Sequence, residues 1–186
     1  MKIALAQFNP TVGALAANVD RMAAMARQAA ARGADIVAFP ELAVCGYPPR
    51  DLLEKPSFVA GCAREAMRLA ELTRDLPLAI IVGTVAPNVR TAGKQLANAA
   101  QVLAQGRAIF EQRKMLLPTY DVFDESRYFV PGEQQGIWEY RGQKIALTIC
   151  EDAWNDKQYW DRPLYSRDPV AELAAAGASV LISING

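Results

Sequence analysis

Two kinds of strand signal in one chain constrain its fold more than any other feature. The N-terminal part runs apolar, helical and apolar again over Lys2–Phe8, Leu15–Arg32 and Asp35–Phe39. This strand–helix–strand order is typical of parallel strands covered by helices. The later part carries hairpin signals instead, because Gln105-Gly106 and Arg141-Gly142 each separate two apolar runs. A purely parallel sheet contains no hairpins, so the mixture predicts an α/β fold that is not a doubly wound parallel sheet.

The spacing of apolar residues predicts the remaining elements. Leu15–Arg32 is Ala-rich with helical spacing, and Gly33 follows as a natural stop. A second helix is expected over Ser57–Leu76, with Cys62 on its apolar side, and a short one over Pro169–Ala176. The expected later strands are Ala79–Val85, Ala97–Leu103, Arg107–Glu111, Gly136–Tyr140, Lys144–Cys150 and Ser179–Ile184.

The length and the C-terminal strand bear on the domain organisation. A chain of 186 residues is the size of one domain. Ser179–Ile184 has the pattern of a central strand, yet the sequence ends two residues later, at Gly186. Since a central strand is ordinarily followed by elements that cover it, we expect a domain that is incomplete at its C-terminal side.

Charge and hydropathy exclude several classes of partner. Lys plus Arg and Asp plus Glu both number 20, so the formal net charge is zero. A protein that binds nucleic acid needs basic residues in excess, so no nucleic-acid partner is expected. No apolar run approaches the roughly 18 residues that span a bilayer, and no secretory signal precedes Lys2–Phe8. We therefore expect no membrane association and a cytoplasmic protein with reduced thiols.

The absence of histidine restricts the available chemistry. It removes Ser-His-Asp and Cys-His catalysis and histidine-based metal sites. Cys45, Cys62 and Cys150 contain no C-x-x-C pair, so a redox dithiol or a zinc ribbon is not expected, and no metal site is predicted. Any proton transfer must use Glu, Asp, Lys, Tyr or Cys.

Three polar residues follow predicted strands, at the strand ends where α/β proteins build their sites. They are Glu41, Lys114 and Cys150. Each has a simpler alternative role. Glu41 could cap nearby amides, Lys114 could extend its ammonium to solvent, and Cys150 could be a small buried apolar residue. Together they supply the base, the cation and the nucleophile that thiol acyl transfer requires without a histidine.

Three motifs around these residues resemble the nitrilase, or carbon–nitrogen hydrolase, superfamily. They read A-F-P-E-L-A-V-C-G-Y around Glu41, R-K-M-L-L-P-T-Y around Lys114 and L-T-I-C-E-D-A-W around Cys150. The order Glu, Lys, Cys also fits, and the resemblance covers the whole chain. It implies an α-β-β-α sandwich, incomplete here at its C-terminal side.

Three further stretches resemble the N-terminal glutaminase domain of the glutamine-dependent NAD synthetase family: Gly46–Leu53, Pro118–Gly132 and Cys150–Asp156. In that family the domain releases ammonia from glutamine to a C-terminal synthetase domain, which uses ATP and Mg²⁺. The resemblance implies that residues 1–186 form a glutamine amidohydrolase domain without the synthetase domain, whose S-G-G-x-D-S loop does not occur here. Glutamine is then the expected substrate and the synthetase domain the expected partner. No cofactor is expected in this chain, and the full enzyme is expected to self-associate.

The mechanism implied for glutamine uses all three strand-end residues. Cys150 attacks the amide carbonyl, Glu41 takes the thiol proton and returns it to the leaving ammonia, and Lys114 stabilises the oxyanion. The backbone amide of Glu151 is a second candidate donor to the oxyanion.

Other residues are expected around the substrate. Tyr120 matches a glutamine-binding tyrosine of the family by position, and Glu151 and Trp154 are expected to line the same pocket. Glu125 is expected as a second carboxylate that orients Lys114, with a surface-loop acid as the alternative. Asn185 lies near a polar substrate contact of the family.

Two rival functions remain open from the sequence. One is a free-standing amidase of the same superfamily that acts on another small amide. The other is an inactive fragment that keeps the sandwich only as an interaction surface.

Overall fold

The computed structural model describes residues 1–156, 158–159 and 161–186. Its larger sheet contains, in spatial order, β1 (Ile3–Leu5), β2 (Ile36–Ala38), β3 (Ala79–Pro87), β4 (Leu96–Ala104) and β5 (Arg107–Arg113). Its smaller sheet contains β6 (Ile137–Tyr140), β7 (Gln143–Ile149) and β8 (Val180–Ile184). The α-helices are α1 (Leu15–Ala31), α2 (Pro56–Leu72) and α3 (Pro169–Ala175), and the 3₁₀ turns are η1 (Arg50–Glu54), η2 (Glu125–Arg127) and η3 (Cys150–Ala153).

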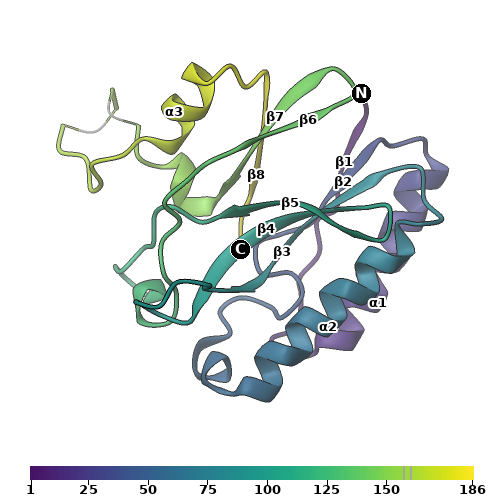
Figure 1. Cartoon of the computed structure of the whole chain (residues 1–186), viewed down its shortest axis with the longest axis horizontal. Helices are drawn as coiled ribbons and strands as arrows, with labels where there is room; N and C mark the ends of the chain where they lie inside the picture. The colour runs from purple at the N-terminus through teal and green to yellow at the C-terminus, as the bar shows by residue number, and fades with distance from the viewer. Residues whose placement is uncertain (157, 160) are drawn as a thin grey trace.

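The elements form an α-β-β-α sandwich, as expected. Helices α1 and α2 lie side by side on the larger sheet, whereas α3 lies beside the smaller sheet, far from them (Figure 1). Alternating side chains of β2 and β3 divide between two apolar layers. Val37 and Ile80 pack with α1 and α2, whereas Ile36 and Ile81 pack with side chains of the smaller sheet such as Leu147.

Both predicted hairpins are present, next to parallel pairings. Strands β1, β2 and β3 are mutually parallel, whereas β3, β4 and β5 are antiparallel neighbours, and β7 pairs antiparallel with β6 and parallel with β8. Gln105, Gly106, Arg141 and Gly142 all have positive φ, between 49° and 80°. Such φ values suit two-residue hairpin turns, whose twist matches the strands.

The two long helices form where the apolar spacing predicts them. Helix α1 buries Val19, Met22 and Ala26, and Gly33 follows it with φ of 72°. Helix α2 ends at Leu72, before the predicted Leu76. Helical backbone at Leu76 is itself disfavoured, because Leu76 precedes Pro77. In the part of the chain that the structure describes, no helix is long and apolar enough to cross a membrane.

Two strands differ from their sequence patterns. β1 is shorter than Lys2–Phe8 and is an edge strand rather than a buried one, so Leu5 is 79% exposed. β8 is also at an edge, not central, among the described strands. Of the strands in the described ranges it pairs with β7 alone, and its side chains alternate, with Ile182 and Ile184 buried and Leu181 exposed. Apolar composition predicted that these segments are strands, but it did not reveal their place in the sheet.

Candidate active site

The candidate residues come from the ends of strands in both sheets. Glu41 follows β2 and Lys114 follows β5 in the larger sheet, whereas Cys150 follows β7 in the smaller one. The Glu41 amide donates a hydrogen bond to the carbonyl of Asn185 (3.1 Å), which adjoins the end of β8. The stacking of the two sheets therefore brings together segments that are distant in sequence.

A glycine on β3 allows the backbone of the turn that carries Glu41 to pack directly against the backbone of that strand. The Gly83 amide donates to the carbonyl of Pro40 (3.2 Å), and its carbonyl accepts from the Val44 amide (3.2 Å). A Cβ atom on Gly83 would lie 2.3 Å from the Leu42 nitrogen and 2.5 Å from the Pro40 oxygen. Only glycine permits this approach, so Gly83 helps to position Glu41.

The Lys114 ammonium is buried between two carboxylates. Its Nζ lies 2.7 Å from Glu41 Oε1 and 2.6 Å from Glu125 Oε1. Burial by itself lowers the pKa of Lys114, but the charges of Glu41 and Glu125 outweigh burial and raise the pKa above its ordinary value. The three residues are between 1% and 5% exposed. A lysine that reaches solvent and a surface-loop Glu125 are therefore both wrong.

Asn98 and Tyr47 complete this cluster, and the sequence analysis missed both. Asn98 Nδ2, on β4, donates to Glu41 Oε1 (2.7 Å) and to Glu125 Oε2 (3.5 Å). The Tyr47 hydroxyl donates to Glu125 Oε1 (3.0 Å). Glu41 therefore binds side chains and does not cap amides with its carboxylate. An asparagine inside the apolar run L-A-N-A-A was the available signal for Asn98.

The second carboxylate of the cluster has an unusual pKa. Burial raises the pKa of Glu125, the nearby Lys114 ammonium lowers it, and the charge of Glu41 raises it again, with a net increase.

The two carboxylate oxygens of Glu41 differ in their contacts. Glu41 Oε1 accepts hydrogen bonds from Lys114 and Asn98. Its Oε2 is buried and has no hydrogen-bond partner among the described residues. This oxygen is free to accept a proton.

Cys150 lies at a strained turn. It begins η3 with φ of 45°, a left-handed conformation that is uncommon for residues other than glycine and that recurs at functional sites. Burial raises the pKa of the thiol to about 11, Glu41 also raises it, and Lys114 lowers it. The thiol is therefore protonated at neutral pH, so a nucleophilic role requires a base.

Glu151 lies next to Cys150 and is held by two tyrosines. Its Oε2 accepts from the Tyr120 hydroxyl (2.7 Å) and its Oε1 from the Tyr165 hydroxyl (3.0 Å). Burial, followed by the hydrogen bond to Glu151, raises the pKa of Tyr120 to about 12. Trp154 is 62% exposed. The structure thus joins Tyr120 to Glu151, adds the unpredicted Tyr165, and leaves Trp154 largely in solvent.

Asp152 links two of the candidate segments through backbone amides. Its Oδ1 accepts from the amides of Met115 and Leu116 (both 2.8 Å), and its Oδ2 accepts from the Ile149 amide (3.0 Å). Burial raises the pKa of this carboxyl to about 6, against the lowering effect of those hydrogen bonds. Local sequence gave no sign of these contacts.

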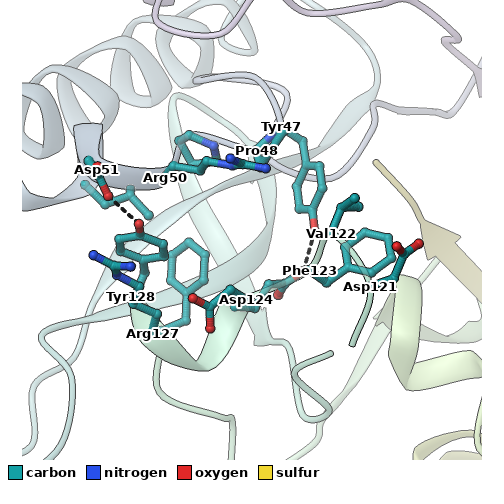
Figure 2. Close-up of a pocket in the computed structure, with 14 residues that line it drawn as sticks. Tyr47, Pro48, Arg50, Asp51, Asp121, Val122, Phe123, Asp124, Arg127 and Tyr128 are labelled. Carbon is teal, nitrogen blue, oxygen red and sulfur yellow. Dashed lines mark hydrogen bonds between the residues drawn. The ribbon is translucent and has the colours of Figure 1, made fainter. Parts of the chain in front are cut away.

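A cavity of about 400 Å³ adjoins the cluster. Tyr47 and Glu125 line it together with other residues of the segments 47–53 and 121–129. Figure 2 shows Tyr47 opposite Phe123, and the hydrogen bond between Asp51 and Tyr128 at the other end of the cavity. Because Glu125 also contacts Lys114, it lies between the cavity and the buried ammonium.

The other cysteines lie in the core. Cys45 and Cys62 are both 0% exposed, in contrast to the partly exposed Cys150. They fit the role of small apolar residues. Among the described residues, no group of three or more His, Cys, Asp and Glu side chains is arranged to hold a metal ion. The reactive groups at the strand ends are a thiol, carboxylates and an ammonium.

Comparisons with known proteins identify the family of the chain. The carbon-nitrogen hydrolase family model matches residues 2–165. The glutamine-dependent NAD(+) synthetase of Synechocystis sp. is 45% identical over 188 residues, which cover 98% of this chain and 33% of that protein. The Thermotoga maritima synthetase is 37% identical over 155 residues, which cover 83% of this chain and 26% of that protein. The chain thus spans between about a quarter and a third of the length of these two curated relatives.

Solved structures show the same fold. The glutamine-dependent NAD+ synthetase from Acinetobacter baumannii, in complex with ADP, superposes with a TM-score of 0.82 and 32% identity, over 99% of this chain and 32% of that one. An amidase from Nesterenkonia sp. gives the same TM-score at 24% identity, over 100% of this chain and 64% of that one. At that identity the amidase supports the fold alone.

Proposed function

The chain belongs to the carbon–nitrogen hydrolase family, and from that premise we propose that it hydrolyses the side-chain amide of glutamine to glutamate and ammonia. One observation carries the proposal. The buried Lys114 ammonium binds Glu41 Oε1, while Glu41 Oε2 has no hydrogen-bond partner in the described part of the chain. This arrangement pairs a buried carboxylate with a cation through one oxygen and leaves its other oxygen available.

Cys150 is the proposed nucleophile and Glu41 its base. The raised pKa of Cys150, about 11, means that the attacking thiol must lose its proton during the reaction. In the proposed step, sulfur bonds to the amide carbon while the thiol proton passes to Glu41. Glu41 then protonates the amide nitrogen, the carbon–nitrogen bond breaks, and ammonia leaves a thioester. Water then attacks the thioester carbon and loses a proton to Glu41. The carbon–sulfur bond breaks, Glu41 returns that proton to the Cys150 sulfur, and glutamate leaves.

Lys114 and a backbone amide would stabilise the oxyanion. Lys114 places a positive charge beside Glu41, and the Glu151 amide belongs to the turn that begins at Cys150. Loss of one oxyanion donor typically lowers the rate by roughly two to three orders of magnitude. Glu125 and Asn98 hold Lys114 and Glu41 in place through hydrogen bonds.

The substrate's amino group is proposed to meet Glu151. This carboxylate is 4% exposed and follows the nucleophile directly, and Tyr120 and Tyr165 orient its two oxygens. A buried negative charge favours the ammonium of a free amino acid over a neutral amide. Tyr120 is 44% exposed, so it could also contact substrate directly; Trp154 stays a proposed lining residue of the same pocket.

We propose that residues 1–186 act as the glutamine amidohydrolase domain of a glutamine-dependent NAD synthetase. The relatives that carry this name and share 37–45% identity support the proposal. In the full-length protein, ammonia would pass to a synthetase domain, to which ATP and Mg²⁺ would belong. Self-association of that enzyme is part of the same proposal.

The test is a paired assay of full-length protein that carries Cys150→Ala. Saturating glutamine and saturating ammonium are compared as nitrogen donors for NAD formation. Glutamine-dependent formation should be abolished and ammonium-dependent formation should remain largely intact, because Cys150 attacks only the glutamine amide. Cys62→Ala is the matched control, since this cysteine is buried on α2, and it should leave both activities unchanged. Equal loss with both donors would contradict the modular assignment, and full activity with glutamine would exclude Cys150 as the nucleophile.

A further inference from the structure

We propose that Asp152 is a positioning residue that holds the turn bearing Cys150 at a set place relative to the segment bearing Lys114. The inference rests on the proposed function, because it concerns the alignment of the same nucleophile and cation. It gives a role to a buried carboxylate that the mechanism itself does not use.

The geometry is that of a tether between the two sheets. Lys114 follows β5 of the larger sheet, and the next two amides, of Met115 and Leu116, both donate to Asp152 Oδ1 at 2.8 Å. The Ile149 amide, which immediately precedes Cys150 at the end of β7, donates to Oδ2 at 3.0 Å. One carboxylate therefore binds both segments, with one oxygen for each.

Burial makes this tether stiff. Asp152 is 1% exposed, so a broken hydrogen bond would leave a buried amide or carboxylate oxygen without water to replace it. The surrounding backbone is strained, because Cys150 has φ of 45°. A strained turn persists only where surrounding contacts hold it, and Asp152 supplies such contacts on both sides of the nucleophile.

The tether predicts a specific defect when it is removed. Rates of this chemistry depend on alignment to within about an ångström, and such a misplacement can cost about 100-fold. Without Asp152, Cys150 should keep its thiol chemistry but lose its alignment with Lys114 and Glu41. Reactions that need the assembled site should slow, whereas reactions that need only an accessible thiol should not.

Two thiol reagents separate these effects in the full-length protein. One reagent is a glutamine analogue with a diazoketone in place of the amide. It labels Cys150 only when the thiol proton is transferred to the diazo carbon and sulfur then displaces dinitrogen. The other reagent is iodoacetamide, whose reaction with a thiolate requires no positioned proton donor. Labelling of the Cys150 peptide is followed by mass spectrometry, and the maximal rate and half-saturating concentration of the analogue are measured separately.

Asp152→Ala should lower the maximal rate of labelling by the analogue at least about ten-fold, with little change in its half-saturating concentration. Iodoacetamide should alkylate Cys150 at least as fast as in the unsubstituted protein. Asp152→Asn should show a smaller loss, because its oxygen can still accept from Met115 and Leu116 while its amide nitrogen opposes the Ile149 amide. If Asp152→Ala does not fold, the labelling rate of Asp152→Asn alone tests whether Asp152 positions Cys150. Asp168→Ala is the matched control, since Asp168 caps α3 through the Ala171 amide (3.0 Å) and should change only thermal stability.

Other outcomes separate the two proposals. If both Asp152 variants fold and keep the unsubstituted maximal rate, or if both reagents slow equally, Asp152 does not position the site. If the unsubstituted full-length protein reacts with iodoacetamide but not with the analogue, the glutamine proposal is wrong, and the positioning inference is withdrawn with it.

Discussion

The Nζ atom of Lys114 lies 2.7 Å from Oε1 of Glu41, although 73 residues separate them in the sequence. Lys114 has a side-chain exposure of 0% and Glu41 of 1%, so this ion pair is removed from solvent. A buried pair of this kind contributes little to stability on balance, because desolvation offsets the attraction. Its proposed value is chemical, since it places a cation against the carboxylate of the proposed base.

Glu41→Gln should lower the pKa of the Cys150 thiol below its value of about 11. The substitution removes a negative charge that raises this pKa, while Lys114, which lowers it, remains. The pH dependence of iodoacetamide alkylation at Cys150 measures the change, and its midpoint should move to lower pH. Glutamine hydrolysis should nevertheless be lost, because the base is absent. An upward shift of the midpoint would show that Glu41 is not coupled to the thiol.

Lys114→Met should destabilise the fold by about 3–5 kcal/mol at neutral pH, because it leaves the buried carboxylates of Glu41 and Glu125 without their cation. Urea unfolding measures the loss. The deficit should shrink as the pH falls, since protonation neutralises carboxylates whose folded pKa values the substitution raises. Lys144→Met is the control on an exposed lysine and should change stability by less than about 0.5 kcal/mol. A deficit independent of pH would argue against the buried charges as its cause.

Asn98 offers two substitutions with opposite electrostatics. Asn98→Ala removes the donor to Glu41 and should destabilise the fold by about 2 kcal/mol. Asn98→Asp adds a carboxylate beside Glu41 and Glu125, and its folded pKa should be raised by burial and by those charges. Its stability should therefore be greatest at acid pH and fall as the pH rises through that raised pKa. Urea unfolding at several pH values distinguishes the two variants, and identical profiles would contradict the proposed environment of Asn98.

Gly83→Ala should impair activity through backbone position alone. Its Cβ would lie 2.3 Å from the Leu42 nitrogen, so the turn that carries Glu41 would have to move. We expect a loss of stability of about 1–3 kcal/mol, typical of overpacking, and a fall in glutamine hydrolysis that exceeds the loss of folded protein. Gly61→Ala, in α2, is the control. Its Cβ would meet the flexible ends of two side chains, Leu15 at 2.8 Å and Arg64 at 3.6 Å, rather than backbone, and alanine favours the helix. Equal effects of both substitutions would argue against Gly83 as a positioning residue.

Local sequence predicted the elements because their signals are short in range. The apolar spacing of α1 and the turn pairs Gln105-Gly106 and Arg141-Gly142 depend on backbone preferences of adjacent residues, and all three formed where expected. The motifs around Glu41 and Lys114 also identified the family before any coordinates. These signals did not reveal that β1 and β8 lie at edges among the described strands, because position within a sheet depends on which strands pair.

The environment of each group depended on the tertiary structure. The residues around Glu125 in the sequence would be the same if it were an exposed acid. In the structure it is 5% exposed and forms an ion pair with Lys114. Asp152 gave no functional signal, and Asn98 gave only that of a polar residue in an apolar run, because the groups that they bind come from segments distant in the sequence. Residue identity determined by itself which acids, bases and thiols this chain can offer. Their charges and contacts were decided only by folding, because burial and long-range hydrogen bonds set the pKa of a group, and neither is encoded in its sequence neighbours.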